Sequence, residues 1–316
     1  MLTEITTSRF NPQVDPGLHV WGWEIPVYLF LGGLVAGMMI LTGYFLLTGR
    51  HRDPRSACHR LPGLGIALLS AGMLALFLDL EHKLFVWRLY TTFRLASPMS
   101  WGAWILLLVY PVLLASLLLG LPRTLGDRVP RLAGIARIAE ELRERPGLVR
   151  AVAIAGMALG GLLGIYTGIL LSALGARPLW NSALLGPLFL VSGLSSAAAF
   201  SHLVAREPEE QDFLARADNG FLIAELALLG LFFIGLLSST RVHIEAADLL
   251  LGGPYTAVFW VFVVGLGAAV PLFLQVLAVR HRIHHSPVIP VLVIAGGIAL
   301  RFVLVYAGQL SHWSPV

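Results

Sequence analysis

The sequence predicts an all-α integral membrane protein with eight transmembrane helices arranged as two four-helix bundles. Of its 316 residues, 57% are hydrophobic and 13% are charged. A soluble domain is roughly 45–50% apolar and about 25% charged. The apolar excess lies in runs of about 20 residues, which is the length that crosses a bilayer core as a helix. Glycines recur at four-residue spacing inside these runs, as at Gly33 and Gly37, which favours close helix packing.

The runs predict eight spans, with polar residues and many prolines in the connections. We expect spans over 23–47, 62–82, 100–121, 149–174, 184–204, 219–238, 256–279 and 288–311. Residues 1–20 lack the basic start and short apolar run of a cleavable signal, so the first run is expected to be retained. Residues 1–22 would form a periplasmic N-terminal segment.

One connection, 122–148, carries its own helical pattern. Apolar residues recur there at helical spacing, with arginine and glutamate on the other face, at Leu132, Ile135, Ile138 and Leu142. The pattern predicts a cytoplasmic surface helix over 131–145. A solvated helix that touches no lipid fits the same pattern equally well.

A weak internal repeat supports the division into two bundles, over 23–174 and 184–311. Residues 30–34 in the first span resemble 190–194 in the fifth, and 165–170 in the fourth resemble 305–310 in the eighth. Equivalent helices are four spans apart, so the repeat would be parallel. Chance similarity between apolar segments is the competing explanation.

The distribution of basic residues predicts the orientation. The odd-numbered connections hold 15 lysine and arginine residues, whereas the N-terminus and the even-numbered connections hold six. Basic residues favour the cytoplasmic side. We therefore expect both termini to face the periplasm of a bacterial inner membrane. The net charge of +4 does not indicate nucleic-acid binding, because the basic residues sit in short connections.

Several polar residues fall at one depth, close to the outer boundary. Asp79 ends the second span, Tyr166 lies late in the fourth, and Arg301 lies just past the middle of the eighth. Glu24 and Tyr28 open the first span, and His19 precedes it. Ionisable residues inside a bilayer usually face protein or water and mark function, although polar residues also decorate helix ends without a further role.

Glu225 lies in the inner half of the sixth span, away from this outer group. It is a candidate for a proton path from the cytoplasm. Capping or bridging of neighbouring helices is the simpler explanation and the one that we favour.

The sequence predicts no haem and no metal in this protein. A transmembrane haem needs paired axial histidines inside the spans, and all ten histidines fall near span ends or in connections. Cys58 is the only cysteine, so it cannot build a disulfide or an iron–sulfur site, and an inert thiol is expected. Any electron transfer would need a diffusible carrier and an external partner on the same face as the site.

Ordered motifs run along nearly the whole sequence. The first is the segment from Trp21 to Gly33, with Ala36-Gly37 after it. The others follow in order: Phe77-Leu78-Asp79-Leu80, Ser97-Pro98-Met99-Ser100-Trp101-Gly102, Tyr166-Thr167-Gly168, Pro178-Leu179-Trp180-Asn181, Pro187-Leu188-Phe189, Gly252-Gly253-Pro254-Tyr255 and Phe259-Trp260. Each motif alone is weak, and the ordered set is specific. Together they resemble the polysulfide reductase membrane-subunit family, also called NrfD-like.

The resemblance implies a quinone-reactive subunit of a respiratory complex. It implies an exchangeable menaquinone or ubiquinone near the outer face, beside a periplasmic iron–sulfur subunit and often a molybdopterin or multihaem catalytic subunit. The matching positions for the quinone head group are Tyr28, Asp79 and Tyr166. Some relatives carry a histidine at the first of these, so Glu24 and His19 are candidate substitutes. Arg301 is a further candidate.

Tyrosine and histidine can donate hydrogen bonds to quinone carbonyls, and a carboxylate such as Asp79 can relay a proton. Two other classes of protein stay open at this point. One is a proton-coupled secondary transporter, which inverted repeats and ionisable residues at the midplane would favour. The other is a structural membrane anchor without a quinone site.

Overall fold

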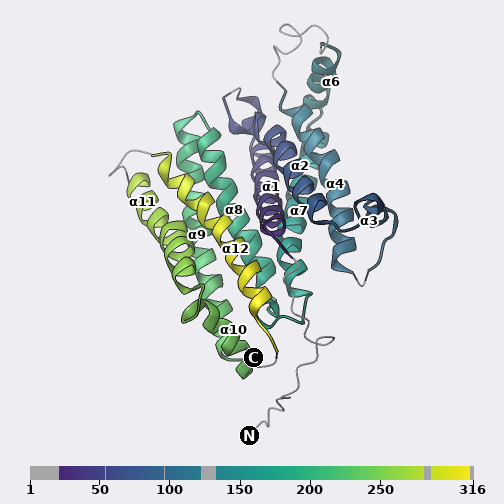
Figure 1. Ribbon diagram of the computed structural model, residues 1–316. Helices are drawn as coiled ribbons and strands as arrows, with labels where there is room; N and C mark the ends of the chain where they lie inside the picture. Colours follow the sequence, from purple (N-terminus) through teal and green to yellow (C-terminus); the bar gives the residue numbers. More distant parts are fainter. Residues whose placement is uncertain (1–20, 54, 96, 122–132, 281–285, 314–316) are drawn as a thin grey trace.

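The computed structural model describes residues 21–53, 55–95, 97–121, 133–280 and 286–313 (Figure 1). Within these residues, eight helical segments are long and apolar enough to cross a membrane, as the sequence predicted. They are α1 (Glu24–Leu47), α2 (Leu61–Asp79), α4 (Pro98–Leu119), α7 (Pro146–Ser172), α8 (Leu185–Val204), α9 (Pro208–Leu237), Val258–Val279 and α12 (Val288–Leu310). The seventh consists of a π-helix, η6 (Val258–Ala269), that continues into α11 (Val270–Val279).

The sixth span differs most from the prediction, because α9 begins at Pro208 and not at 219. Proline at the start of a helix leaves no donor unsatisfied, and Glu209 and Glu210 favour the positive end of the helix dipole. Hydropathy reports only the apolar part of a helix. The extension places Asp218 inside the helix, whereas the predicted span began one residue after it.

Shorter helices occupy the connections. They are η1 (Arg50–Arg52), η2 (Ala57–His59), η3 (Lys83–Phe85), α3 (Arg88–Thr91), α6 (Ala133–Arg143), η5 (Pro178–Trp180) and α10 (Arg241–Leu251). The structure therefore has a helix within the range 131–145, and contact of this helix with lipid stays a prediction. The guanidinium of Arg143 donates to the carbonyl of Leu121, which ties α6 to the end of α4.

Helix α1 lies at the centre of the structure, in contact with α2, α7, α8 and α12. Glycines, which have no Cβ, permit these contacts. A Cβ on Gly37 would lie 2.6 Å from Cβ of Ala197 in α8, and one on Gly160 in α7 would lie 2.6 Å from the carbonyl oxygen of Ala36. The glycine spacing in the sequence thus corresponds to backbones in close approach.

The helix contacts are consistent with two groups, although the two-bundle division stays a prediction. Helices α1, α2, α4 and α7 contact one another in a ring, and α8, α9, η6–α11 and α12 form a second ring. Helices α1 and α7 also pack extensively on α8, so the groups share a broad interface. We call the end where α1 begins and α12 finishes the terminal end, and the opposite end, which carries α6, the α6 end (Figure 1).

Candidate functional site

Two tyrosines from different helices meet inside the protein near the terminal end. Tyr28 lies in the second turn of α1, and Tyr166 lies fewer than two turns before the end of α7. Their side chains are 2% and 5% exposed, and the two hydroxyls are hydrogen-bonded. Met73 and Leu170 pack against the apolar clusters on both sides of this pair. The result is a hydrogen-bonded pair of phenols with apolar walls.

The position of Tyr166 depends on Gly102 in α4. A Cβ on Gly102 would overlap the ring of Tyr166 at Cζ and Oη. The phenol therefore fills the space that any other residue at 102 would occupy. The motif at the start of the third predicted span therefore has a packing role, because its glycine, Gly102, leaves space for the ring of Tyr166 in the fourth span.

Tyr90, which the sequence analysis did not single out, completes the group. It lies in α3 and is close enough to Tyr28 and Tyr166 to interact with both electrostatically. Burial, and secondarily the neighbouring Tyr110, raises the pKa of the Tyr90 hydroxyl above its usual value. No pattern in the sequence pointed to it, because α3 is only four residues long and lies in a connection.

The two predicted carboxylates lie near each other at helix ends. Asp79 is the last residue of α2 and Glu24 is the first residue of α1, and both side chains are half-buried. They are close enough to repel each other electrostatically. A proton shared in this region would relieve that repulsion, which suits a carboxylate that accepts and releases protons.

A pocket of about 490 Å³ opens between α3 and the start of α4, and neither Tyr28 nor Tyr166 is among its lining residues. Its lining includes Leu80, which follows Asp79, and Leu89, which precedes Tyr90. Ser100, one further lining residue, lies two positions before Gly102. Pockets for organic ligands usually measure roughly 300–1,000 Å³. The indole Nε1 of Trp104, in α4, is buried without a hydrogen-bond partner among the described residues.

Arg301 does not join the tyrosines but lies deeper, in the second ring of helices. Its guanidinium is fully buried, donates to the hydroxyl of Ser192 and the carbonyl of Phe189, and interacts with the carboxylate of Glu225. Glu225 also accepts from Ser192, so it bridges α9, α8 and α12. His19 lies outside the described residues.

Among the described residues, no three histidine, cysteine, aspartate or glutamate side chains are arranged to hold a metal ion. Cys58 is 1% exposed, and burial, with a smaller effect of Glu210, raises the pKa of its thiol to about 12. A thiol of this kind is inert at neutral pH.

Comparison with known proteins gives a consistent result. The family model described as Polysulphide reductase, NrfD matches residues 11–312. The sequence is 34% identical over 307 residues to the C subunit of the polysulfide reductase of Wolinella succinogenes, covering 92% of this protein and 94% of that subunit. The protein belongs to the polysulphide reductase NrfD family.

Two further members of the family match over similar lengths. Protein NrfD of Escherichia coli is 31% identical over 314 residues, covering 92% of this protein and 96% of that one. The NrfD homolog of Haemophilus influenzae is 28% identical over 317 residues, covering 95% and 97%. Membership makes the protein a multi-pass membrane subunit of a respiratory oxidoreductase.

Proposed function

We propose that the protein binds menaquinone or ubiquinone at the terminal end and exchanges electrons between the quinone pool and a periplasmic iron–sulfur subunit. The single observation that carries this proposal is the buried, hydrogen-bonded pair of Tyr28 and Tyr166. The family supports the same proposal, since its member from Wolinella succinogenes is the C subunit of a polysulfide reductase.

The residues present suit a quinone head group. A quinone becomes a quinol when it takes up two electrons and two protons, and its carbonyl oxygens need hydrogen-bond donors. One hydroxyl of the Tyr28–Tyr166 pair donates to the other, which leaves one O–H free to donate to a quinone carbonyl, and the apolar walls suit the ring and its tail. Asp79 can accept a proton from a quinol or deliver one to a quinone as its side chain titrates.

The electrons need a partner at the same end of the protein. The sequence has a single cysteine and no paired histidines inside the spans, so its own residues offer no ligand set for a redox centre. We propose that the partner is a periplasmic iron–sulfur subunit, itself joined to a molybdopterin or multihaem catalytic subunit. The complex would sit in the bacterial inner membrane with both termini in the periplasm.

Binding of a quinone analogue to the purified complex tests the proposal. The double variant Tyr28→Phe/Tyr166→Phe should weaken binding by about tenfold, because a hydrogen bond contributes roughly 0.5–1.5 kcal/mol. Tyr44→Phe is the matched control, since Tyr44 lies in the same helix at the α6 end and stacks on Phe213. An analogue that does not bind the wild-type complex would favour a transporter or a structural anchor instead.

Reporter fusions test the proposed orientation. A fusion near Gly134 should report the cytoplasm and a fusion at Val316 should report the periplasm, because of the excess of basic residues in the odd-numbered connections. A cytoplasmic Val316 would put the tyrosine site on the wrong side for a periplasmic partner and would overturn this arrangement.

A further inference from the structure

One connection concentrates positive charge on the side of the protein where basic residues are scarce. The N-terminus and the even-numbered connections hold six lysine and arginine residues, and three of these, Lys83, Arg88 and Arg94, lie between α2 and α4. Basic residues on this side oppose the usual distribution in membrane proteins. Their presence in one short connection therefore requires an explanation.

The two arginines of this connection differ from the other described arginines at the terminal end. Arg177 is fully buried and donates to a backbone carbonyl of the C-terminal segment, and Arg241 pairs with Glu245 at 2.9 Å. Arg88 and Arg94 are both exposed, and neither forms an ion pair among the described residues. Their charges are available to an anion from outside the protein.

Aromatic rings hold the guanidinium of Arg88. Its Cζ lies 4.6 Å from the centre of the Phe85 ring and 5.6 Å from the centre of the Trp87 ring. An arginine over an aromatic face is attracted to the ring and keeps its N–H donors for an anion. Two such donors match two oxygens of a phosphate group. Arg88 is thus positioned before an anion binds.

Hydrogen bonds fix the segment that carries Arg94. Its backbone N–H donates to Oγ of Ser100 at 3.0 Å, and that hydroxyl donates to the carbonyl of Thr92 at 3.2 Å. The indole of Trp101 donates to the carbonyl of Leu95 at 2.8 Å. The turn that presents Arg94 is therefore tied to the first residues of α4.

Both arginines line the pocket of about 490 Å³ between α3 and the start of α4. The lining also has hydroxyl donors at Thr92 and Ser97 and apolar side chains at Phe85 and Met99. Its one carboxylate is that of Glu81, so two arginines face one acid and the lining is positively charged. Cations with hydroxyl donors suit a phosphate, and the apolar part of the wall suits a hydrocarbon chain.

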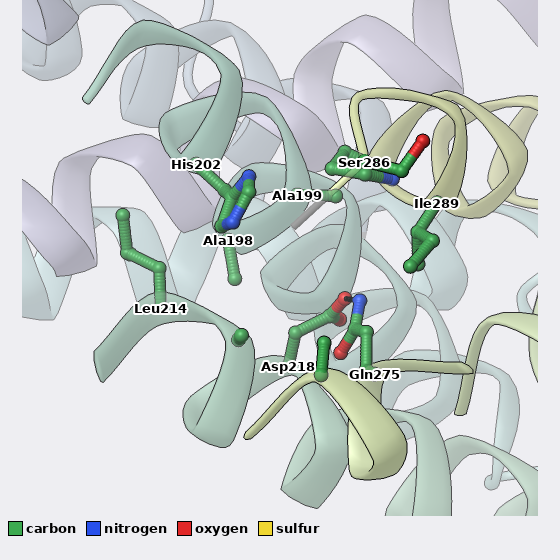
Figure 2. A pocket seen from close by; sticks show the side chains of 11 residues that line it. Ala198, Ala199, His202, Leu214, Asp218, Gln275, Ser286 and Ile289 are labelled. Carbon is green, nitrogen blue, oxygen red and sulfur yellow. Dashed lines mark hydrogen bonds between the residues drawn. The ribbon is translucent and has the colours of Figure 1, made fainter. Parts of the chain in front are cut away.

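The pocket of the second ring, shown in Figure 2, has a different character. It measures about 10 Å³, which is close to the least space that holds one water molecule. Asp218 in its wall accepts from Ser195 and Gln275, both at 2.6 Å. A carboxylate repels a phosphate. Of these two pockets, only the one at α3 suits an organic anion.

The position of the connection favours a lipid as the source of that anion. Figure 1 shows α3 at the side of the bundle, next to α4, where a bilayer would surround the helices. Leu84, Trp87 and Leu95 are 88%, 55% and 73% exposed. Large apolar side chains on the side of a membrane protein contact lipid, and tryptophan is typical of the boundary between lipid and water. A phospholipid at this boundary presents its phosphate at the level of the arginines.

We propose that the pocket between α3 and α4 binds an anionic phospholipid of the surrounding leaflet. Its phosphate lies between Arg88 and Arg94, and its chains extend along Phe85 and Met99. The bound lipid fastens α3, and with it Tyr90, to the side of the bundle. The site does not depend on the proposed quinone function, because the lipid takes part in no electron transfer.

Native mass spectrometry of the purified complex tests the proposal. Phosphatidylglycerol is the anionic probe, and phosphatidylcholine with the same chains is the zwitterionic comparison. The wild type should bind phosphatidylglycerol at least about tenfold more tightly, because each basic residue near a membrane surface contributes about fivefold for an anionic lipid. The double variant Arg88→Gln/Arg94→Gln should lose this preference.

Arg241→Gln is the matched control, because Arg241 is an exposed arginine of the same end that already pairs with Glu245. It should keep the wild-type preference. If the double variant does not assemble, the wild-type complex provides a second measurement. A phosphatidylglycerol with a photoreactive chain should label the peptide that contains Phe85 and Met99 and should leave the peptide of α10 unlabelled.

Equal binding of the two lipids by the wild type, or an unchanged preference in the double variant, would overturn the proposal. Displacement of the lipid by inorganic phosphate at equal concentration would assign the pocket to a free anion instead. Displacement by a quinone analogue would make the pocket part of the quinone site. Loss of a partner subunit from the double variant, with lipid binding unchanged, would assign the arginines to a protein interface.

Discussion

In the first half of the structure, α1 to α7, the candidate site residues lie near the terminal end. In the second half, α8 to α12, Asp218, Glu225 and Arg301 lie within long helices. The first half buries neutral phenols at Tyr28 and Tyr166 and keeps its carboxylates Glu24 and Asp79 at helix ends. The second half buries Asp218 and Glu225 within one helix.

The two halves differ in the kind of polar group that they bury and in how that group is compensated. A phenol can be buried against an apolar ligand at low cost, because one hydrogen bond satisfies its hydroxyl. A buried carboxylate needs a cation, several donors or water, and the second half supplies these through Arg301, Ser192 and Gln275. The first half therefore presents neutral phenols between apolar walls, and the second half presents carboxylates that neighbouring polar side chains compensate.

The largest effect should come from Asp79→Asn, which removes the titratable carboxyl group of Asp79 and keeps the shape of the side chain. We expect quinone turnover in membranes to fall by roughly 10²-fold or more, the range for a positioned acid or base. Co-purification of the iron–sulfur partner checks assembly. Near-normal turnover would eliminate the proton role of Asp79, and loss of assembly would make this residue structural.

The next largest effect should come from Gly102→Ala. The new methyl group would overlap the ring of Tyr166, so the phenol must move and its bond to Tyr28 should be lost. Overpacking of this kind usually costs about 1–3 kcal/mol. We expect about a tenfold fall in turnover and a lower melting temperature of the complex.

Gly161→Ala is the control for this substitution, because it adds the same methyl group to α7 at a position where no atom beyond its chain neighbours and its own helix backbone would lie within 4 Å of the new Cβ. Both measured quantities should stay at the wild-type value. Equal behaviour of the two alanine variants would mean that the position of Tyr166 does not matter for turnover.

Tyr166→Phe should have a smaller effect than either change. It removes one hydroxyl and leaves the ring in place over Gly102. Loss of one oriented donor costs up to about 10²–10³ in rate in other enzymes. We expect several-fold here, because Tyr28 and Tyr90 remain beside the site. Steady-state turnover at several quinone concentrations would measure it, and a fall greater than that of Asp79→Asn would reverse the proposed roles.

The smallest expected effect is on the reactivity of Cys58. This residue lies at the α6 end, in an apolar cluster that contains residues of both halves, and Glu210 is close to it. Burial raises the pKa of this thiol to about 12, whereas an exposed thiol has a pKa of about 8.5. Between these two pH values the thiol is neutral in the folded protein and ionised in the unfolded protein. Alkylation should be negligible at pH 8 and should rise only as the pH approaches 12, whereas detergent-denatured protein should react from about pH 8.5. Fast labelling at pH 8 would show that the halves separate.

The sequence determined the number of spans and the level of Tyr28 and Tyr166 along their helices. Eight apolar runs gave eight helices, since each must satisfy its backbone groups internally in lipid. Depth follows from a rise of about 1.5 Å per residue, which is why Tyr28 and Tyr166 were expected at one level. The charged start of α9 escaped prediction because hydropathy marks only the apolar part of a helix.

Only the tertiary structure decided which residues of equal depth meet. Lipid-facing and core-facing positions are both apolar in these helices, so hydrophobicity does not fix the rotation of a helix about its axis. In α2, for example, Leu69 is fully buried and Leu74 is 57% exposed. The rotation of each helix brings Tyr28 to Tyr166 across Gly102 and turns Arg301 toward Glu225. Contacts between helices far apart in the sequence set that rotation, and no single segment encodes it.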